Sequence, residues 1–195
     1  YGLKPAGNEG TWFQQVPLLE ATPVLPGSSA TLTRDNTTVE FEYGTDYLPG
    51  ADFLASNSNV TAPLAFAGFG VEAPELQYND FEHVDLTGRI AVIFSGAPAR
   101  FPVSARAYHS WNLRKWTKLV EHGAVGVIVV DSPEDAQRVP WERALALSWV
   151  PQMRWLDENG AAVDSFPELK LRFRFNPAAA SRLFDGAEHT YEEVT

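Results

Sequence analysis

The sequence predicts a single α+β domain built on a mixed β-sheet or open barrel. Three observations lead to this fold class. Expected strands outnumber expected helices, a strand–helix–strand unit occupies Thr87–Asp131, and strands with alternating apolar and polar residues flank that unit. Alternation is typical of strands buried on one face, which favours antiparallel or edge positions. With 195 residues, the chain is long enough for one domain with its own core.

Two short apolar runs, Arg89–Phe94 and Ala124–Val130, form the strands of the central unit. Both are rich in Val and Ile, and the sequence around each contains glycine, which favours strands buried on both faces. A helical pattern separates them. Two buried strands joined by a helix predict a right-handed crossover between parallel strands.

The expected helix of this unit has Ser110 as its cap and ends near Gly123. Apolar residues recur at spacings of three and four, so they share one face. That buried face comprises Leu113, Trp116, Thr117 and Val120. The opposite, solvent-facing side comprises Arg114, Lys115 and Lys118.

The flanking segments supply the remaining strands. Thr38–Tyr43 and Glu168–Phe175 alternate cleanly, whereas Leu64–Val71 contains Gly68 and Gly70, which indicates a bulge or a close backbone approach. A helix is expected to open at Asn176-Pro177 and to run through Phe184. Three weaker assignments are a strand at residues 12–16, a strand at residues 146–150 and helical turns at residues 152–159.

Composition narrows the function classes. The net charge is −10 and there is no basic run, so neither nucleic acid nor an anionic membrane is an expected partner. The chain has no cysteine, which excludes disulfides and thiolate chemistry. No run of about 18 apolar residues occurs, so no membrane span is expected. Because the chain starts at Tyr1 instead of Met, we interpret it as a processed or excised piece.

Motifs for catalysis and cofactors are sparse. There is no P-loop and no G-x-S-x-G, and Gly68-Phe69-Gly70 lacks the third glycine of a dinucleotide fingerprint. His83-Val84-Asp85 and Glu192-Glu193 contain residue types that serve in zinc hydrolases. The structural alternatives are a polar surface loop and an acidic tail, and we favour them. We therefore expect no catalytic residue, no metal ligand and no cofactor in this chain.

The order of several segments resembles the protease-associated (PA) domain, in the version inserted in di-zinc aminopeptidases related to glutamate carboxypeptidase and the transferrin receptor. The segment APLAFAGFGVEAP at residues 62–74 carries most of the resemblance. YNDF at 78–81, VDLTGRIAVI at 84–93 and HGAVGVIVV at 122–130 follow in the family's order. Lys115-Trp116-Thr117 is similar to the family's segment before the last of these. The opening residues 2–18 resemble the junction with a peptidase domain, and residues 176–184 resemble the helix near the insert's end.

The resemblance implies a PA-domain-like mixed β-sandwich or open barrel with a central strand–helix–strand crossover and flanking helices. It divides the chain into a junction at residues 1–18 and a PA domain at residues 19–195. It also implies a non-catalytic role beside a zinc aminopeptidase, a hydrolase whose zinc and catalytic residues lie in the parent's peptidase domain. The implied partners are that peptidase domain in cis and a peptide or protein substrate, and the implied location is periplasmic or extracellular.

Two loops after the central strands, residues 97–108 and 132–141, are the expected contact regions, because ligands favour the carboxyl ends of parallel strands. The candidate substrate or partner contacts are Arg100, Phe101, Tyr108, Trp111 and Trp141. Two alternatives remain open. One is a stand-alone protein-interaction module without a peptidase, and the other is an enzyme that uses His83 and Asp85 on a metal.

Overall fold

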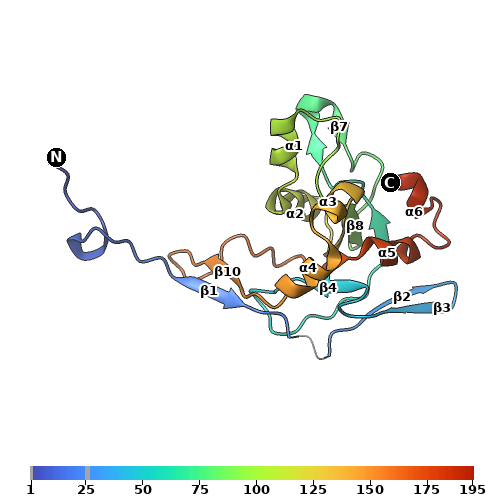
Figure 1. The fold of residues 1–195 in the computed structure, drawn as a ribbon, viewed down its shortest axis with the longest axis horizontal. Coiled ribbons are helices and arrows are strands. Elements are labelled where there is room, and N and C mark those ends of the chain that lie inside the picture. Colours follow the sequence, from blue (N-terminus) through green and yellow to red (C-terminus); the bar gives the residue numbers. More distant parts are fainter. Residues whose placement is uncertain (1, 25–26) are drawn as a thin grey trace.

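The computed structural model describes residues 2–24 and 27–195, apart from the side chain of residue 134 (Figure 1). It is an α+β fold, as the sequence predicts. The described part contains a five-stranded sheet in the order β4 (Tyr47–Pro49), β11 (Arg172–Phe175), β9 (Gly126–Val130), β8 (Ile90–Phe94) and β5 (Leu64–Phe66). Three two-stranded sheets accompany it: β1 (Leu18–Ala21) with β10 (Gln152–Trp155), β2 (Ala30–Arg34) with β3 (Thr37–Phe41), and β6 (Glu72–Ala73) with β7 (Tyr78–Asn79).

The helices of the described part are short. The α-helices are α1 (Val103–His109), α2 (Asn112–Glu121), α3 (Pro133–Arg138), α4 (Trp141–Leu147), α5 (Pro177–Ala180) and α6 (Tyr191–Val194). The 3-10 helices are η1 (Asn8–Gly10), η2 (Pro74–Leu76) and η3 (Ser181–Leu183). No helix within the described residues is long and apolar enough to cross a bilayer.

The five-stranded sheet is mixed. Strands β5, β8, β9 and β11 run parallel, and β4 pairs antiparallel with β11. The predicted parallel pairing of β8 with β9 across α2 is confirmed. Strand β11 was expected in an antiparallel or edge position; it does pair antiparallel with β4, but it lies inside the sheet. Its arginines tolerate that position because they are satisfied: Arg174 forms a bidentate ion pair with Asp131, and Arg172 donates to two carbonyls.

Both faces of the sheet are covered, which explains why β8 has no polar residue. Its five residues are all buried. Ile90, Val92 and Phe94 belong to a core cluster on one face, and Ala91 and Ile93 belong to a cluster on the other. Alternate residues of one strand point to opposite faces, so a strand between two cores must be apolar throughout.

The prediction of which face of α2 is buried is partly wrong. Lys115, assigned to solvent, is among the most deeply buried side chains, together with Leu119. Its ammonium donates to the Phe94 carbonyl oxygen at 2.9 Å, which satisfies the charge while the aliphatic stem packs in the core. Ser110 does not cap α2 either. It is the C-cap residue of α1, which forms within the segment expected to be a loop, and Trp111 precedes α2.

Residues 141–155 also differ from the expectation. Helix α4 covers the start of the expected strand at 146–150, and the expected helical turns at 152–159 contain β10. Strand β10 pairs with β1, more than a hundred residues earlier, so its partner is invisible to a local pattern. Asn176 does cap α5, by accepting from the Ala178 amide, and Pro177 occupies the first turn as predicted.

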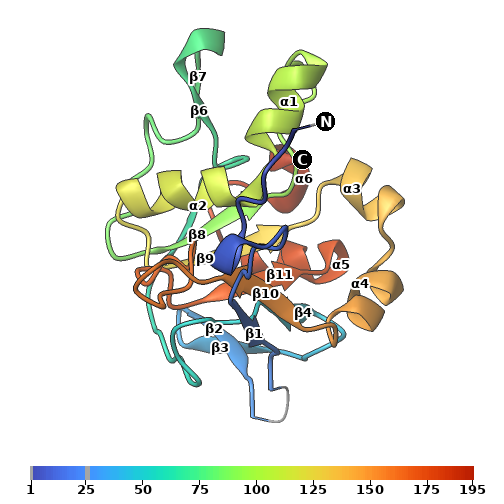
Figure 2. The ribbon, with the colours of Figure 1, turned by 90° about the vertical axis from the view of Figure 1, so that its left-hand side faces the viewer.

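The N-terminal segment extends away from the body of the molecule (Figure 1). The expected strand at residues 12–16 does not form; the strand begins at Leu18. Trp12, Phe13 and Val16 are all exposed. From β1 onward the chain joins β10 in a two-stranded ribbon beside the sheet (Figures 1 and 2).

Candidate binding groove beside helix α2

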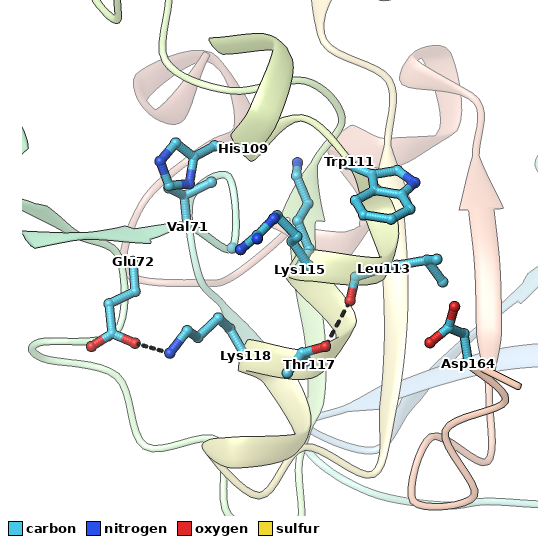
Figure 3. A pocket seen from close by; sticks show the side chains of 11 residues that line it. Val71, Glu72, His109, Trp111, Leu113, Lys115, Thr117, Lys118 and Asp164 are labelled. Atoms are coloured by element: carbon cyan, nitrogen blue, oxygen red, sulfur yellow. Dashed lines mark hydrogen bonds and ion pairs between the residues drawn. The ribbon is translucent and has the colours of Figure 1, made fainter. Parts of the chain in front are cut away.

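Two adjoining hollows lie along the first half of α2. We call them together the α2 groove. The first has a volume of about 340 Å³ and the second about 510 Å³, and they share Trp111, Leu113 and Asp164. Figure 3 shows the first hollow, with Glu72 and Lys118 paired on one side of α2 and Asp164 on the other. The groove therefore draws on α2, on the segment around β6 and on the loop after β10.

The first hollow is rich in cations. Arg114, Lys115 and Lys118 line it, against the carboxylates of Glu72 and Asp164. Lys118 lies 3.0 Å from Glu72, and its hydrogen bond lowers the pKa of that carboxyl below its usual value. Lys118 also pairs with Glu121 at 2.8 Å, and the charges of Asp80 and Asp135 act on Lys115. The cations around the hollow are therefore balanced by carboxylates.

Arg114 is the exposed cation of this hollow. Its guanidinium stacks on the Tyr108 ring, 3.5 Å from the ring centroid. Within the described part of the chain, no carboxylate lies at ion-pair distance from it. Stacking restrains the planar fork while its N–H edges stay available, which is the arrangement that suits bidentate binding of a carboxylate.

The second hollow is aromatic. Trp111, Trp116 and Trp155 line it with Met153, and Arg154 contributes to the lining while its guanidinium lies over the Phe53 ring. Trp111 and Trp155 are more than half exposed. The Trp116 Nε1 and Arg154 Nε donors are buried, and neither has a hydrogen-bond acceptor among the described residues. Both atoms are closed to solvent, because the Trp116 ring packs against Phe166 and the Arg154 guanidinium lies over the Phe53 ring.

Beneath the groove, Lys115 and Asp80 fix the shape of the first hollow. Burial lowers the pKa of Lys115 to about 8, although the charges of Asp80 and Asp135 oppose this. Asp80 accepts hydrogen bonds from the amides of Phe69 and Val71, both at 3.0 Å, and from the Tyr78 hydroxyl at 2.6 Å. Burial raises the Asp80 pKa despite these bonds.

Gly68 confirms the predicted close backbone approach. It has φ of +47°, and a Cβ at this position would lie 2.2 Å from the Asp80 carboxylate. A side chain would therefore meet both a left-handed backbone and a charged oxygen. The turn at Gly68 and its Asp80 partner are one unit, which holds Val71 and Glu72 against α2.

The predicted contact residues separate into two groups. Tyr108 and Trp111 lie at the groove, where Tyr108 carries Arg114 and Trp111 lines both hollows. Arg100 is exposed and stacks on Tyr78, whereas Phe101 is buried in a small core cluster. Trp141 lies elsewhere and donates its indole N–H to the Gly44 carbonyl.

Sequence reasoning missed several members of the groove. Asp164, Arg154 and Met153 carried no motif, and their segments are brought to α2 only by the pairing of β10 with β1. Trp155 belongs to the tryptophan-rich segment after α2, but nothing local distinguishes it from a core residue. Lys115 could have been noticed, because it interrupts the apolar spacing between Trp111 and Leu119.

Two of the residues weighed as metal ligands, Asp85 and Glu193, have local structural roles. Asp85 accepts from the Thr87 amide, and Glu193 closes a capping box with Thr190 at the start of α6. His83 is exposed. Among the described residues, no three His, Asp or Glu side chains are grouped so that they could hold a metal ion.

Comparisons with known proteins give a likeness among solved structures and none by sequence. No protein-family model matches the sequence, and no curated protein matches it. Among solved structures, the chain is similar to an aminopeptidase from Aneurinibacillus sp. strain AM-1, with a TM-score of 0.41 and 18% sequence identity. The match covers 88% of this chain and 31% of that chain, so this chain spans less than a third of that aminopeptidase's length.

Proposed function

We propose that this chain is a non-catalytic PA domain of a secreted zinc aminopeptidase, and that it recognises peptide or protein segments and shapes their access to the peptidase domain. The observation that carries the binding role is the α2 groove. It is open, lined by the exposed rings of Trp111 and Trp155, and bordered by the Arg114 guanidinium on Tyr108. Such a surface suits the capture of a chain segment, because tryptophan gives large contact area and a donor.

The sequence resemblance supports the assignment to a PA domain. Its main segment, residues 62–74, is also the part of the chain that the Asp80 carboxylate organises. Lys115, from the later segment Lys115-Trp116-Thr117, is the buried cation beneath the groove. The residues that carry the resemblance thus build the floor of the proposed binding surface, and the reaction itself is assigned to a domain outside this chain.

The exposed face of the β1–β10 ribbon supports a neighbour in cis. Leu18 and Trp155 are paired across the ribbon, Met153 lies on the same face, and all three are about half exposed. Exposed apolar patches commonly mark interfaces. We place the parent's peptidase domain against residues 1–18, at the Leu18 end of this face, because Met153 and Trp155 line the α2 groove.

The first experiment determines the natural product. Its intact mass, with peptide mapping at both ends, is expected to exceed 21.5 kDa and to include a peptidase segment beyond Thr195. A product that ends near Thr195 and carries no peptidase would overturn the inserted-domain role and leave an interaction module.

The second experiment tests the role in access. In the full-length product, Trp155→Ser is expected to lower kcat/KM for an octapeptide about threefold more than for a single amino-acid anilide. A threefold ratio corresponds to a difference of about 0.7 kcal/mol in activation free energy. Trp149→Ser, equally exposed but outside the groove lining, is the matched control. Equal losses on both substrates would contradict the proposal.

A further inference from the structure

The second hollow of the α2 groove contains an unpaired carboxylate. Asp164 is exposed and lines both hollows, and its side chain makes no ion pair or hydrogen bond within the part of the chain that the structure describes. Figure 3 shows it on the same side of α2 as Trp111, away from the paired Glu72 and Lys118. An unpaired carboxylate at a hollow attracts cations and repels anions.

The backbone that carries Asp164 is held in an uncommon conformation. Asp164 has φ of +56° and Phe166 has φ of +48°, a region that bulky residues rarely adopt. The Phe166 ring packs edge-on against Trp116, with 5.9 Å between the ring centroids, and Arg172 donates to the Ser165 carbonyl at 3.0 Å. Such conformations persist where the surrounding structure fixes them, and they are frequent at binding sites. The Asp164 carboxylate is therefore held at the hollow by its neighbours.

The wall beside this carboxylate is aromatic. Trp111 and Trp155 are 58% and 53% exposed, and Met153 is exposed on the same face of β10 as Trp155. The face of an indole ring has a negative electrostatic potential, which attracts ammonium and guanidinium groups. A tryptophan wall next to a carboxylate therefore suits a side chain with an apolar stem and a cationic end.

Two arginines near the site oppose a bound cation. Arg154 lies between Met153 and Trp155 in β10, so its side chain points to the other face of the ribbon, where the guanidinium is 4.8 Å from the centroid of the Phe53 ring. Arg114 lines the first hollow and not the second. Their charges lower the affinity of the site for a cation, but the net charge of −10 on the whole chain favours a cationic partner.

We infer that the second hollow of the α2 groove binds the side chain of a lysine or arginine in an extended peptide. The aliphatic stem packs on Trp111 and Trp155, and the ammonium or guanidinium group pairs with Asp164. The two hollows adjoin at Trp111, Leu113 and Asp164, so the peptide can continue past this site into the first hollow. This inference rests on the proposed recognition function and specifies the charge of its partner.

The test compares blocked pentapeptides that differ at the central residue, which is lysine, arginine, norleucine or glutamate between alanines. The full chain is titrated with each peptide, and the indole N–H resonances of its six tryptophans are followed by NMR after assignment with Trp→Phe variants. We expect the Trp111 and Trp155 resonances to shift. The lysine peptide should bind about fivefold more tightly than the norleucine peptide, which has the same stem without the charge. Equal or tighter binding of the norleucine or glutamate peptide would overturn the inference.

A pair of variants then tests the carboxylate. Asp164→Asn should weaken binding of the lysine peptide about threefold and leave the norleucine peptide unchanged, and asparagine accepts the left-handed backbone at that position. Glu158→Gln is the matched control, because it removes one exposed carboxylate from the same segment after β10 but lies outside the lining of both hollows. Equal losses in the two variants would mean that net charge alone attracts the peptide, and the site would be wrong.

The outcomes separate this inference from the proposed function. If all four peptides shift the Trp111 and Trp155 resonances with equal affinity, the groove recognises peptides but the cationic specificity is wrong. If no peptide shifts either resonance, both the specificity and the groove's recognition role fail. A norleucine peptide with a free amino terminus is the last comparison, since tighter binding than that of the blocked lysine peptide would assign the hollow to a chain end instead of a side chain. A loss confined to the charged peptides cannot arise from unfolding, which would weaken the norleucine peptide equally.

Discussion

The five-stranded sheet and the β1–β10 ribbon use the same residue types in different ways. In the sheet, every side chain of β8 is buried between two cores. In the ribbon, Leu19 and Ala21 pack on the cluster around Phe53, while Met153 and Trp155 on the opposite face remain about half exposed. The sheet thus buries its apolar side chains in two cores, whereas the ribbon leaves part of its apolar surface exposed.

The same contrast between a buried and an exposed side chain occurs at two adjacent positions of α2. Arg114 and Lys115 follow one another on α2, but Arg114 is exposed on the Tyr108 ring and Lys115 is buried against the Phe94 carbonyl. A helix turns by about 100° per residue, so neighbouring side chains serve different surfaces. Substitutions in the two regions should consequently change different properties, stability in the sheet and binding at the groove.

The largest effect on stability is expected at Asp80, which follows β7 and accepts hydrogen bonds from the turn after β5. Asp80→Ala removes three hydrogen bonds and leaves the Phe69 and Val71 amides without their acceptor. We expect the free energy of unfolding to fall by about 2–4 kcal/mol. Urea denaturation followed by circular dichroism measures it. Asp85→Ala is the control, because that exposed carboxylate accepts from one backbone amide, at Thr87. Equal losses of unfolding free energy in the two variants would show that the turn at Asp80 stabilises the fold no more than the exposed turn at Asp85.

An intermediate effect is expected at Lys115 and depends on pH. The folded protein releases this proton near pH 8, whereas the unfolded chain keeps it up to about 10.5. The unfolded state therefore binds more protons in this window, and the free energy of unfolding should rise with pH, by at most about 1.4 kcal/mol per pH unit.

Lys115→Met keeps a similar volume and abolishes this titration. The difference in unfolding free energy between wild type and variant should therefore change in favour of wild type from pH 8 to pH 10. Urea titrations at half-unit intervals measure it, with Lys118→Met as the surface control. A constant difference across the window would show that Lys115 is not desolvated in the folded state.

The smallest effect on stability is expected on the ribbon. Trp155→Ser removes an exposed ring, so the free energy of unfolding should change by about 0.5 kcal/mol or less. The same substitution should reduce retention of the chain on a hydrophobic-interaction column, because an exposed apolar group is lost. A large destabilisation would mean that the exposed face of the ribbon is part of the core.

The central unit could be predicted because burial on both faces leaves a continuous apolar run, as in β8 and β9, and such a run is visible in the sequence. The β1–β10 ribbon could not be predicted, because Gln152–Trp155 has no strong local pattern and its register with Leu18–Ala21 is fixed by tertiary packing. The burial of Lys115 was not predicted, for a different reason. Periodicity treats lysine as polar along its whole length, but the stem is apolar and the ammonium needs one acceptor.

The candidate site could be predicted from the sequence only in part. Tyr108 ends the loop expected to contact a ligand after the first central strand, and it lies under Arg114 beside the groove. Trp111 lies outside the two expected loops but is a predicted contact residue, and it lines both hollows. Asp164 and Arg154 belong to a segment whose approach to α2 depends on long-range strand pairing. Residue type alone gives no reason to associate them with Arg114.

The register of the ribbon has a consequence for the wall of the groove. Leu18 is paired with Trp155 and Leu19 with Arg154. Because side chains alternate along a strand, a slip of β10 by one residue would turn Met153 and Trp155 inward and Arg154 outward. The tryptophan wall of the groove would then be replaced by a lone cation without any change in sequence. The chemical identity of this surface is therefore encoded by strand alignment as much as by the residues themselves.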